Sequence, residues 1–299
     1  MMLNRKKVIV FVLAVVGALI LGAVIFGILN ALVAQGKWSF GWRDYRYDES
    51  GFEIGEGSIP ADAVTHIELD WIDGEVEIVP CQDRYFSVTE FAQDELPESA
   101  KVRWRVSEDG STLTVRYRKS SWFFGVGSGN REKKLTLRVP ERFFDQLSSL
   151  DVSVVSTNVT VKGMVAESFS FSSDMGALST EKCVFGSVSV TTKNGDIRVG
   201  ADVDGTVEMS SRNSALTLIT GTCPQQIKVE TKGGDVTLSL PEDASFALEW
   251  TTDKGGITSD FAGRQDGTVY TVGTGEKQYS VQSRKGDLLL TVTKATEAK

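Results

Sequence analysis

The chain offers few residues with the chemistry of an active site. His66 is the single histidine and lies beside a strand-like stretch. One histidine excludes a metal site built from several histidines and gives poor support for a serine or cysteine triad. The sequence contains no Gly-x-Ser-x-Gly, His-Glu-x-x-His or Gly-x-x-x-x-Gly-Lys motif. We therefore interpret His66 as a partly exposed strand residue.

Two glycine-containing loops have some likeness to ligand sites. The stretch "GVGSGN" from Gly125 precedes a basic strand rather than a helix, so it predicts a loop and not a nucleotide cradle. The stretch "DVDG" from Asp202 lacks the further ligands of a calcium loop. Three cysteines, Cys81, Cys183 and Cys223, are too far apart and odd in number for a disulfide framework. We assign no catalytic, cofactor-binding or metal-binding residue, and no cofactor.

The N-terminal segment predicts a membrane anchor. Residues 8–34 carry no charged side chain, and Arg5, Lys6 and Lys7 precede them. About 20 apolar residues suffice to cross a bilayer, and flanking positive charges stay in the cytoplasm. A cleaved signal peptide is the alternative, but its apolar core would be shorter and would end at a small-x-small site. We expect a single-pass cell-membrane protein with a cytoplasmic N-terminus and an extracellular C-terminal domain.

The acidic charge of the domain and the small residues of the predicted span indicate which partners to expect. All 40 acidic residues and all but three of the 32 basic residues lie beyond residue 36. An acidic domain argues against nucleic acid as the ligand, because phosphate binding needs a positive face. Within the span, Ala14, Ala18 and Gly22 recur every four residues, a spacing that allows two helices to pack closely. A homodimer through the span is an expectation on that ground.

A repeat of 19–20 residues runs through the rest of the chain. Apolar residues seven apart flank a polar turn, as Val190 and Ile197 do around "TTKNGDI". Alternation with period two predicts strands with one buried face, and a fixed period with several apolar columns is typical of a solenoid. A meander of antiparallel hairpins is the alternative, but its loops need not keep a constant length. The predicted columns are Leu150, Phe169, Val188, Val207, Ile227 and Phe246; Val159, Leu178, Ile197 and Leu216; and Val165, Val184 and Val203.

The turns themselves favour scaffold over active site. Gly195, Gly234 and Gly286 occupy equivalent turn positions, where glycine tolerates positive φ. Thr157 and Ser214 occupy the same slot, so the slot selects small residues. The outward positions beside the columns are mostly hydroxyls, with Ser168, Ser170, Ser187, Ser189, Thr206 and Ser210 among them.

These patterns divide an all-β chain into six parts. We expect "KVRWRVS" to join an antiparallel patch in the N-terminal region, "PERFFDQLSSL" to supply one short helical turn, and "GTVYTVGTGEKQYSVQS" to form a hairpin that covers the last coil. The parts are a basic cytoplasmic tip at 1–7, the transmembrane anchor at 8–34, a juxtamembrane linker at 35–61, an N-terminal β region or cap at 62–147, β-solenoid coils at 148–261, and a C-terminal hairpin and cap at 262–299.

The recurring Ser/Thr-x-x-Gly-Asp-Val/Ile turn, together with "LSLPEDASFALEWTTDKGGITSDF", resembles the bacterial "putative adhesin" family of β-solenoid domains, the LiaG-like envelope proteins. The resemblance covers residues 62–293. It implies a domain behind one N-terminal span, an association with cell-envelope stress, and no catalytic residues. Turns such as "STNV" and "RNSA" depart from the Gly-Asp consensus but keep the columns.

Two classes of function compete at this point. The first is a non-catalytic binding or sensing scaffold in the bacterial envelope, whose partner is an envelope protein or a cell-wall polymer. The second is a polysaccharide-processing β-helix enzyme, which would need paired acids on adjacent coils. The hydroxyl-rich outward positions favour the first.

Overall fold

The computed structural model describes residues 50–117 and 133–293. All of the described residues belong to one compact unit of the chain. The predicted anchor at 8–34 and the loop "GVGSGN" therefore lie outside the described residues. Within the described ranges, no helix is both long and apolar enough to cross a bilayer.

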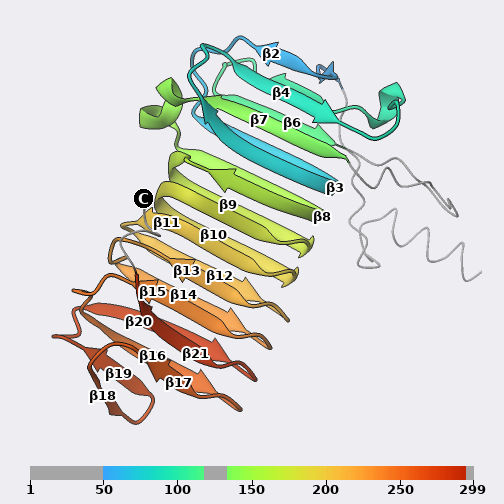
Figure 1. The fold of residues 1–299 in the computed structure, drawn as a ribbon. Helices are drawn as coiled ribbons and strands as arrows, with labels where there is room; N and C mark the ends of the chain where they lie inside the picture. The colour runs from blue at the N-terminus through green and yellow to red at the C-terminus, as the bar shows by residue number, and fades with distance from the viewer. Residues whose placement is uncertain (1–49, 118–132, 294–299) are drawn as a thin grey trace, which may run out of the picture. The chain divides into compact units, whose positions relative to one another are not determined.

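The described residues form an all-β domain with two short 3₁₀ helices, which confirms the predicted fold class at that level (Figure 1). Its strands belong to one hydrogen-bonded sheet. The helices are η1 (Glu98–Ala100) and η2 (Glu141–Gln146), the second being the expected short turn. The strands are β1 (Glu53–Ile54), β2 (Gly57–Ile59), β3 (His66–Cys81), β4 (Phe86–Phe91), β5 (Arg103–Val106), β6 (Thr112–Tyr117), β7 (Lys134–Pro140), β8 (Ser149–Lys162), β9 (Val165–Met175), β10 (Leu178–Asn194), β11 (Ile197–Val203), β12 (Thr206–Ser211), β13 (Leu216–Ile219), β14 (Gln226–Thr231), β15 (Val236–Leu240), β16 (Phe246–Thr252), β17 (Ile257–Ser259), β18 (Gly263–Asp266), β19 (Val269–Val272), β20 (Lys277–Ser283) and β21 (Leu288–Val292).

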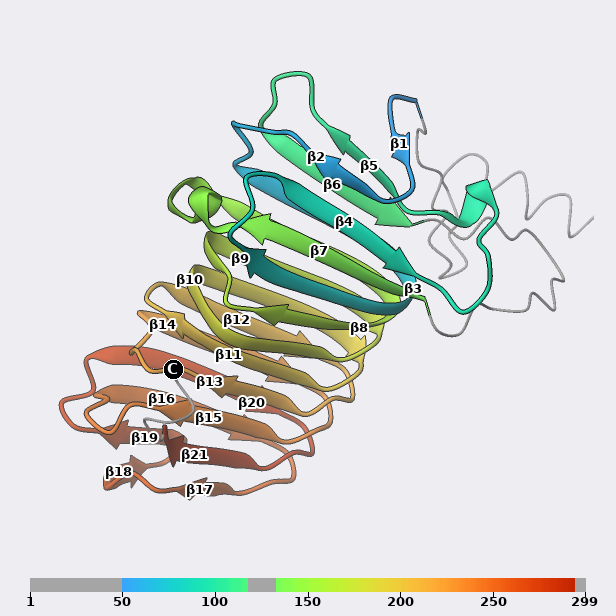
Figure 2. The same cartoon turned by 45° about the horizontal axis from the view of Figure 1, so that its top comes forward.

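Successive coils stack in parallel and in register. Each coil places one strand segment in a first ladder, turns, and places the next in a second ladder. The first ladder runs through β3, β8, β9, β10, β12 and β14, and the second through β3, β8, β10, β11, β13 and β15 (Figure 1, Figure 2). Parallel pairing at the repeat distance is the arrangement of a solenoid and not of a hairpin meander.

The core columns follow the predicted alternation over most of the stack. Val190 pairs with Phe171 on one side and Met209 on the other, and it is 1% exposed. The column from Leu150 to Ile227 and the column from Val159 to Leu216 are likewise buried and in register. Stacked apolar side chains from both ladders form one continuous core.

One predicted column is wrong at two of its three residues, Val165 and Val184. Val184 pairs with Val165 on one side and with Asp202, instead of the expected Val203, on the other. Its side chain is 46% exposed. The inward position belongs to Phe185, which pairs with Ala166 and Val203. The cause is a register shift between Thr180 and Cys183, where one extra residue reverses which side chains face the core. Lys182 lies at this bulge and has a φ of 54°.

The C-terminal coil is not the last coil in space. Strand β20 lies between β14 and β16, and β21 lies between β15 and β17 (Figure 1). Tyr279 pairs with Ile227 on one side and Leu248 on the other, so the predicted step from Ile227 to Phe246 is wrong. Phe246 instead pairs with Lys277. The insertion buries Tyr279 and Val281 between two coils, which a terminal position would not do.

The expected hairpin over "GTVYTVGTGEKQYSVQS" also differs. Strand β19 pairs antiparallel with β18 and β16, while β20 is parallel to both of its neighbours. The β18–β19 hairpin therefore covers the outer edge of β16, the last strand of the first ladder. A covered edge has fewer free backbone groups for association with another chain.

The N-terminal region is a mixed cap. Strands β6 and β7 continue the two ladders in parallel with β3, whereas β5 and β4 add to them antiparallel. The expected antiparallel patch is thus restricted to these outer strands. Residues 53–59, within the predicted linker at 35–61, form β1 and β2, which pair with β5 and β4. Ile59 packs in the core with no exposure, which explains why these residues are not a free linker.

A buried ion pair lies inside this cap. Lys133 Nζ is 2.5 Å from Glu90 Oε1, and the two side chains are 1% and 4% exposed. Lys133 also donates to the carbonyl of Ala100 and lies 3.1 Å from the ring centroid of Tyr117. Burial lowers the pKa of Lys133 from 10.5 to about 8, against the opposing effect of Glu90. The cap therefore holds a cation whose desolvation is only partly offset.

The register predicts unequal effects of the same substituent at adjacent sites. Val190→Asp should cost several kcal/mol of unfolding free energy, because an unpaired carboxylate enters the core. Thr191→Asp, whose outward neighbours are Ser172 and Ser210, should cost about 1 kcal/mol or less. Chemical denaturation of the two variants measures the difference. Equal losses would contradict the register.

The buried ion pair predicts a pH dependence. The pKa of Lys133 is lower in the folded chain than in the unfolded chain, so the unfolded chain binds the ammonium proton more tightly. The contribution of Lys133 to the unfolding free energy therefore rises between pH 8 and 10.5. The control is Lys133→Met combined with Glu90→Gln, which removes both charges. The unfolding free energy of the native chain relative to this variant should rise by about 1–2 kcal/mol between pH 8 and 10. A flat or falling difference would refute the assignment.

Candidate binding face

The outward side of the first ladder is a regular array of small polar side chains. Alternation along each strand turns these side chains away from the core. The six hydroxyl residues that the sequence predicts to face outward are all among them. We call this array the hydroxyl face. Its residues are Ser149, Asp151 and Ser153 on β8, Ser168, Ser170 and Ser172 on β9, Ser187, Ser189 and Thr191 on β10, and Thr206, Glu208 and Ser210 on β12.

Hydrogen bonds link this face along the stack. Asp151 accepts from Ser149 Oγ at 2.7 Å and also from Ser170 Oγ on the next strand. Ser172 Oγ donates to Ser153 Oγ at 3.2 Å. On β10, by contrast, the side chains of Ser187, Ser189 and Thr191 make no hydrogen bond to any part of the chain that the structure describes. Those three hydroxyls can donate and accept toward an external ligand.

A shallow hollow of about 250 Å³ lies at the N-terminal end of this face. Its polar lining is Glu68, Asp70, Asp151, Ser153, Ser170 and Ser172. Glu68 is the register partner of Asp151, and Thr114 Oγ1 donates to Glu68 Oε2 at 3.3 Å. The hollow thus holds acids on adjacent strands, a feature that the sequence analysis missed. The repeat-like spacing of Ile67, Leu69, Val76 and Ile78 is the signal that could have placed β3 beside β8.

The isolated candidates from the sequence do not assemble into a site. His66 is exposed, with Nδ1 2.7 Å from Thr65 Oγ1. Asp202 of "DVDG" accepts the backbone N–H of Gly221 at 2.8 Å and so braces the next coil. Among the residues described, no group of three or more His, Cys, Asp or Glu side chains is placed to hold a metal ion.

The cysteines are separate thiols. Cys81, Cys183 and Cys223 form no disulfide with one another in the structure. Cys183 is buried, and burial raises the pKa of its thiol to about 11. A thiol with a raised pKa is a weak nucleophile at neutral pH. Cys183 therefore serves packing rather than chemistry.

The recurring turn is a ladder of backbone contacts. Asp196 Oδ1 accepts the N–H of Ala215 at 3.2 Å, and Asp235 Oδ1 accepts the N–H of Asp287 at 2.9 Å. Gly195 has a φ of 122°, and a Cβ there would lie 2.1 Å from the carbonyl oxygen of Gly176. The side chain braces the neighbouring coil, and the glycine permits its close approach. Both roles are structural.

One protein-family model and several solved structures are similar to this chain. The family model "Toastrack DUF4097" matches residues 64–291. One similar solved structure is a "putative cell adhesion protein" from Clostridium sporogenes ATCC 15579, with 11% identity, 81% of this chain and 98% of that chain covered, and a TM-score of 0.35. Another is a "putative adhesin" from Bacteroides fragilis NCTC 9343, with 12% identity, 82% and 98% coverage, and a TM-score of 0.39. The comparison with curated proteins gives no match.

The turn predicts opposite sensitivities for two adjacent residues. Gly195→Val should lower the melting temperature strongly, because a β-branched residue is strained at this φ, by about 1–3 kcal/mol, and its Cβ meets the backbone of Gly176. Asp196→Asn should change it little, since an amide oxygen also accepts the N–H of Ala215. Thermal melts with and without calcium measure both. Stabilisation by calcium that requires Asp196 would contradict the scaffold role.

Proposed function

This chain belongs to the Toastrack DUF4097 family, and we propose that it is a membrane-anchored, extracytoplasmic binding module without catalytic activity. The observation that carries the proposal is the hydroxyl face, where four neighbouring strands present hydroxyl and carboxylate groups in register. A flat, repeated polar surface suits a partner that is itself extended. We name an envelope protein or a cell-wall polymer as that partner.

The anchor is part of the proposal. The uncharged run at 8–34 and the three preceding basic residues support a single span with its N-terminus in the cytoplasm. The domain from residue 50 onward is then extracellular and close to the wall. The spacing of Ala14, Ala18 and Gly22 supports a homodimer through the span. A role in envelope stress rests on the family resemblance alone.

The second candidate is a polysaccharide-processing enzyme. It is favoured by the register pair Glu68 and Asp151 in the hollow, because glycoside hydrolysis uses two carboxyl groups on either side of one bond. Against it, three hydroxyl groups already donate to these carboxylates, which favours acceptor roles for both. Release of reducing sugar from wall material, lost in both Glu68→Gln and Asp151→Asn, would favour the enzyme.

Retention by the wall tests the binding module. The full chain in detergent is sedimented with purified wall sacculi, and we expect it in the pellet. Substituting Ser187, Ser189 and Thr191 with alanine should reduce the bound fraction. The matched control replaces Ser179, Thr217 and Thr237 with alanine. These three lie in one outward column of the second ladder, with Arg198 between the first two, and this variant should bind as the native chain does.

Two results would count against the proposal. If the native chain stays in the supernatant, or if both triple variants bind alike, the hydroxyl face does not hold the wall. The orientation is checked on intact protoplasts, where added protease should remove the C-terminal domain. Protection of that domain would place it in the cytoplasm.

A further inference from the structure

The turns between the ladders carry a line of basic side chains. The residues just after the register set Thr192, Ser211, Thr231 and Ser283 are Lys193, Arg212, Lys232 and Arg284. Lys254 and Lys285 extend the line in the neighbouring turn position, and the N–H of Lys254 bonds to the carbonyl of Arg284 at 3.1 Å. We call these six residues the basic ridge. Its five coils span about 19 Å at about 4.8 Å per strand.

Four of the six ridge side chains lack a partner within the part of the chain that the structure describes. Lys193 pairs with Asp174 at 2.9 Å, and Arg284 pairs with Asp253 at 3.4 Å. The side chains of Arg212, Lys232, Lys254 and Lys285 are exposed and form no ion pair or hydrogen bond with the described residues. The ridge therefore presents cations that only an external anion would neutralise.

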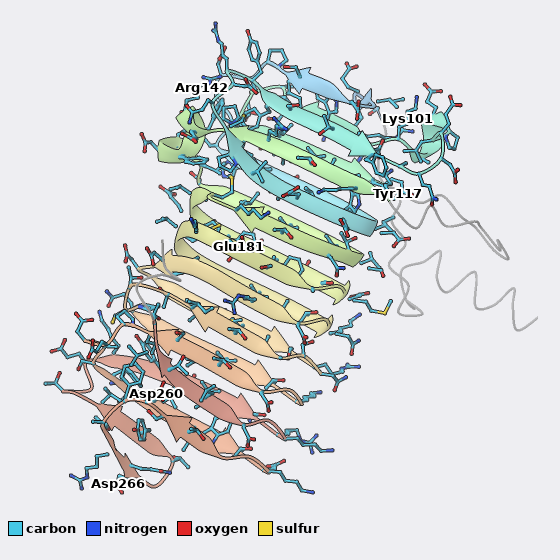
Figure 3. All side chains as sticks on the ribbon, viewed as in Figure 1. Lys101, Tyr117, Arg142, Glu181, Asp260 and Asp266 are labelled. Carbon is cyan, nitrogen blue, oxygen red and sulfur yellow. The ribbon has the colours of Figure 1, made fainter. Side chains whose placement is uncertain are left out.

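These turns also carry acids, of which Asp174 and Asp253 pair with ridge residues. Asp196, Asp235 and Asp287 each accept a backbone N–H from the neighbouring coil, so their carboxylates are held against the scaffold. The opposite edge of the stack is mainly acidic, with Glu167, Glu181, Asp204, Glu242 and Asp243 exposed beside Lys182. Figure 3 labels Glu181 on that opposite edge. The ridge edge thus carries basic and acidic side chains, whereas the opposite edge carries mainly acidic ones, in a chain whose net charge is −8.

We propose that the basic ridge binds a linear phosphodiester polymer of the cell wall. This inference rests on the proposed function and specifies its partner. A single line of Lys and Arg, repeated at strand spacing, matches anionic groups repeated along a chain, and both side chains bind phosphate oxygens. A flat membrane would instead be matched by basic residues spread over a face. No aromatic side chain stands in the ridge to stack on bases, which disfavours a nucleic acid.

Binding to a defined polymer tests the ridge. The full chain in phosphatidylcholine nanodiscs is titrated into fluorescent poly(glycerol phosphate), and anisotropy is followed at several salt concentrations. The ridge variant carries Arg212→Gln, Lys232→Gln and Lys254→Gln. The control carries Lys101→Gln, Lys182→Gln and Arg264→Gln, which remove the same charge from exposed sites elsewhere. Melting curves establish that both variants are folded.

The ridge variant should bind about tenfold or more weakly, with a log-log salt slope smaller by about 2, because each lost contact removes about 0.7. The control variant should bind as the native chain does. Equal losses in both variants would overturn the inference, since they would report net charge alone. Inorganic phosphate that competes at the same phosphate concentration, or stronger binding to phosphatidylglycerol vesicles than to the polymer, would overturn it as well.

The outcomes separate this inference from the proposed function. Sacculi stripped of anionic polymers still present the remaining wall to the hydroxyl face. If the native chain sediments with stripped sacculi but does not bind poly(glycerol phosphate), the ridge inference fails and the binding module stands. If the polymer binds but intact sacculi do not retain the chain, the wall-binding function fails.

Discussion

The structure depends on the pairing of every coil with its neighbours through parallel backbone hydrogen bonds. A coil that gains or loses residues would leave buried N–H and C=O groups without partners, so the repeat stays close to 19–20 residues. This constraint is strictest in the turns. At Gly195 the neighbouring backbone lies so close that a Cβ would be 2.1 Å from the Gly176 carbonyl oxygen. The stacking of the coils therefore requires small residues in the turn, whereas outward side chains such as Ser187, Ser189 and Thr191 make no hydrogen bond to the described residues.

The sequence predicts those parts of the fold that follow from local alternation. Val190 is buried and Ser189 is exposed because neighbouring residues of a strand point to opposite sides. Prediction fails where a non-local event intervenes. Val184 is exposed because a bulge at Lys182 shifts the register, and an apolar residue alone does not reveal a bulge. Phe246 does not pair with Ile227, because Tyr279 of the later strand β20 pairs with Ile227 instead.

The same distinction applies to the candidate sites. The hydroxyl face is visible in the sequence, since it consists of the outward positions of strands that the period identifies. The hollow is not, because it depends on the pairing of Glu68 with Asp151, which are 83 positions apart in the sequence and meet only when β3 joins the stack. The basic ridge can be predicted from the sequence only in part. Its residues recur once per coil, but their alignment across Lys232, Arg284 and Lys254 requires the insertion of the C-terminal coil.

That insertion also determines how the stack ends. A solenoid that finished with β20 and β21 would expose one edge of each, together with Tyr279, Val281, Leu288 and Leu290, which are at most 3% exposed in the structure. Placing this coil inside the stack transfers the edge to β16 and β17. The antiparallel strand β19 covers β16, and β17 has only three residues. A short or covered edge offers little template for pairing with another chain. The chain thus uses its most apolar late segment as interior and its polar hairpin, β18–β19, as cover. This arrangement leaves the outward faces and turns, rather than the ends, as the surfaces where a partner can bind.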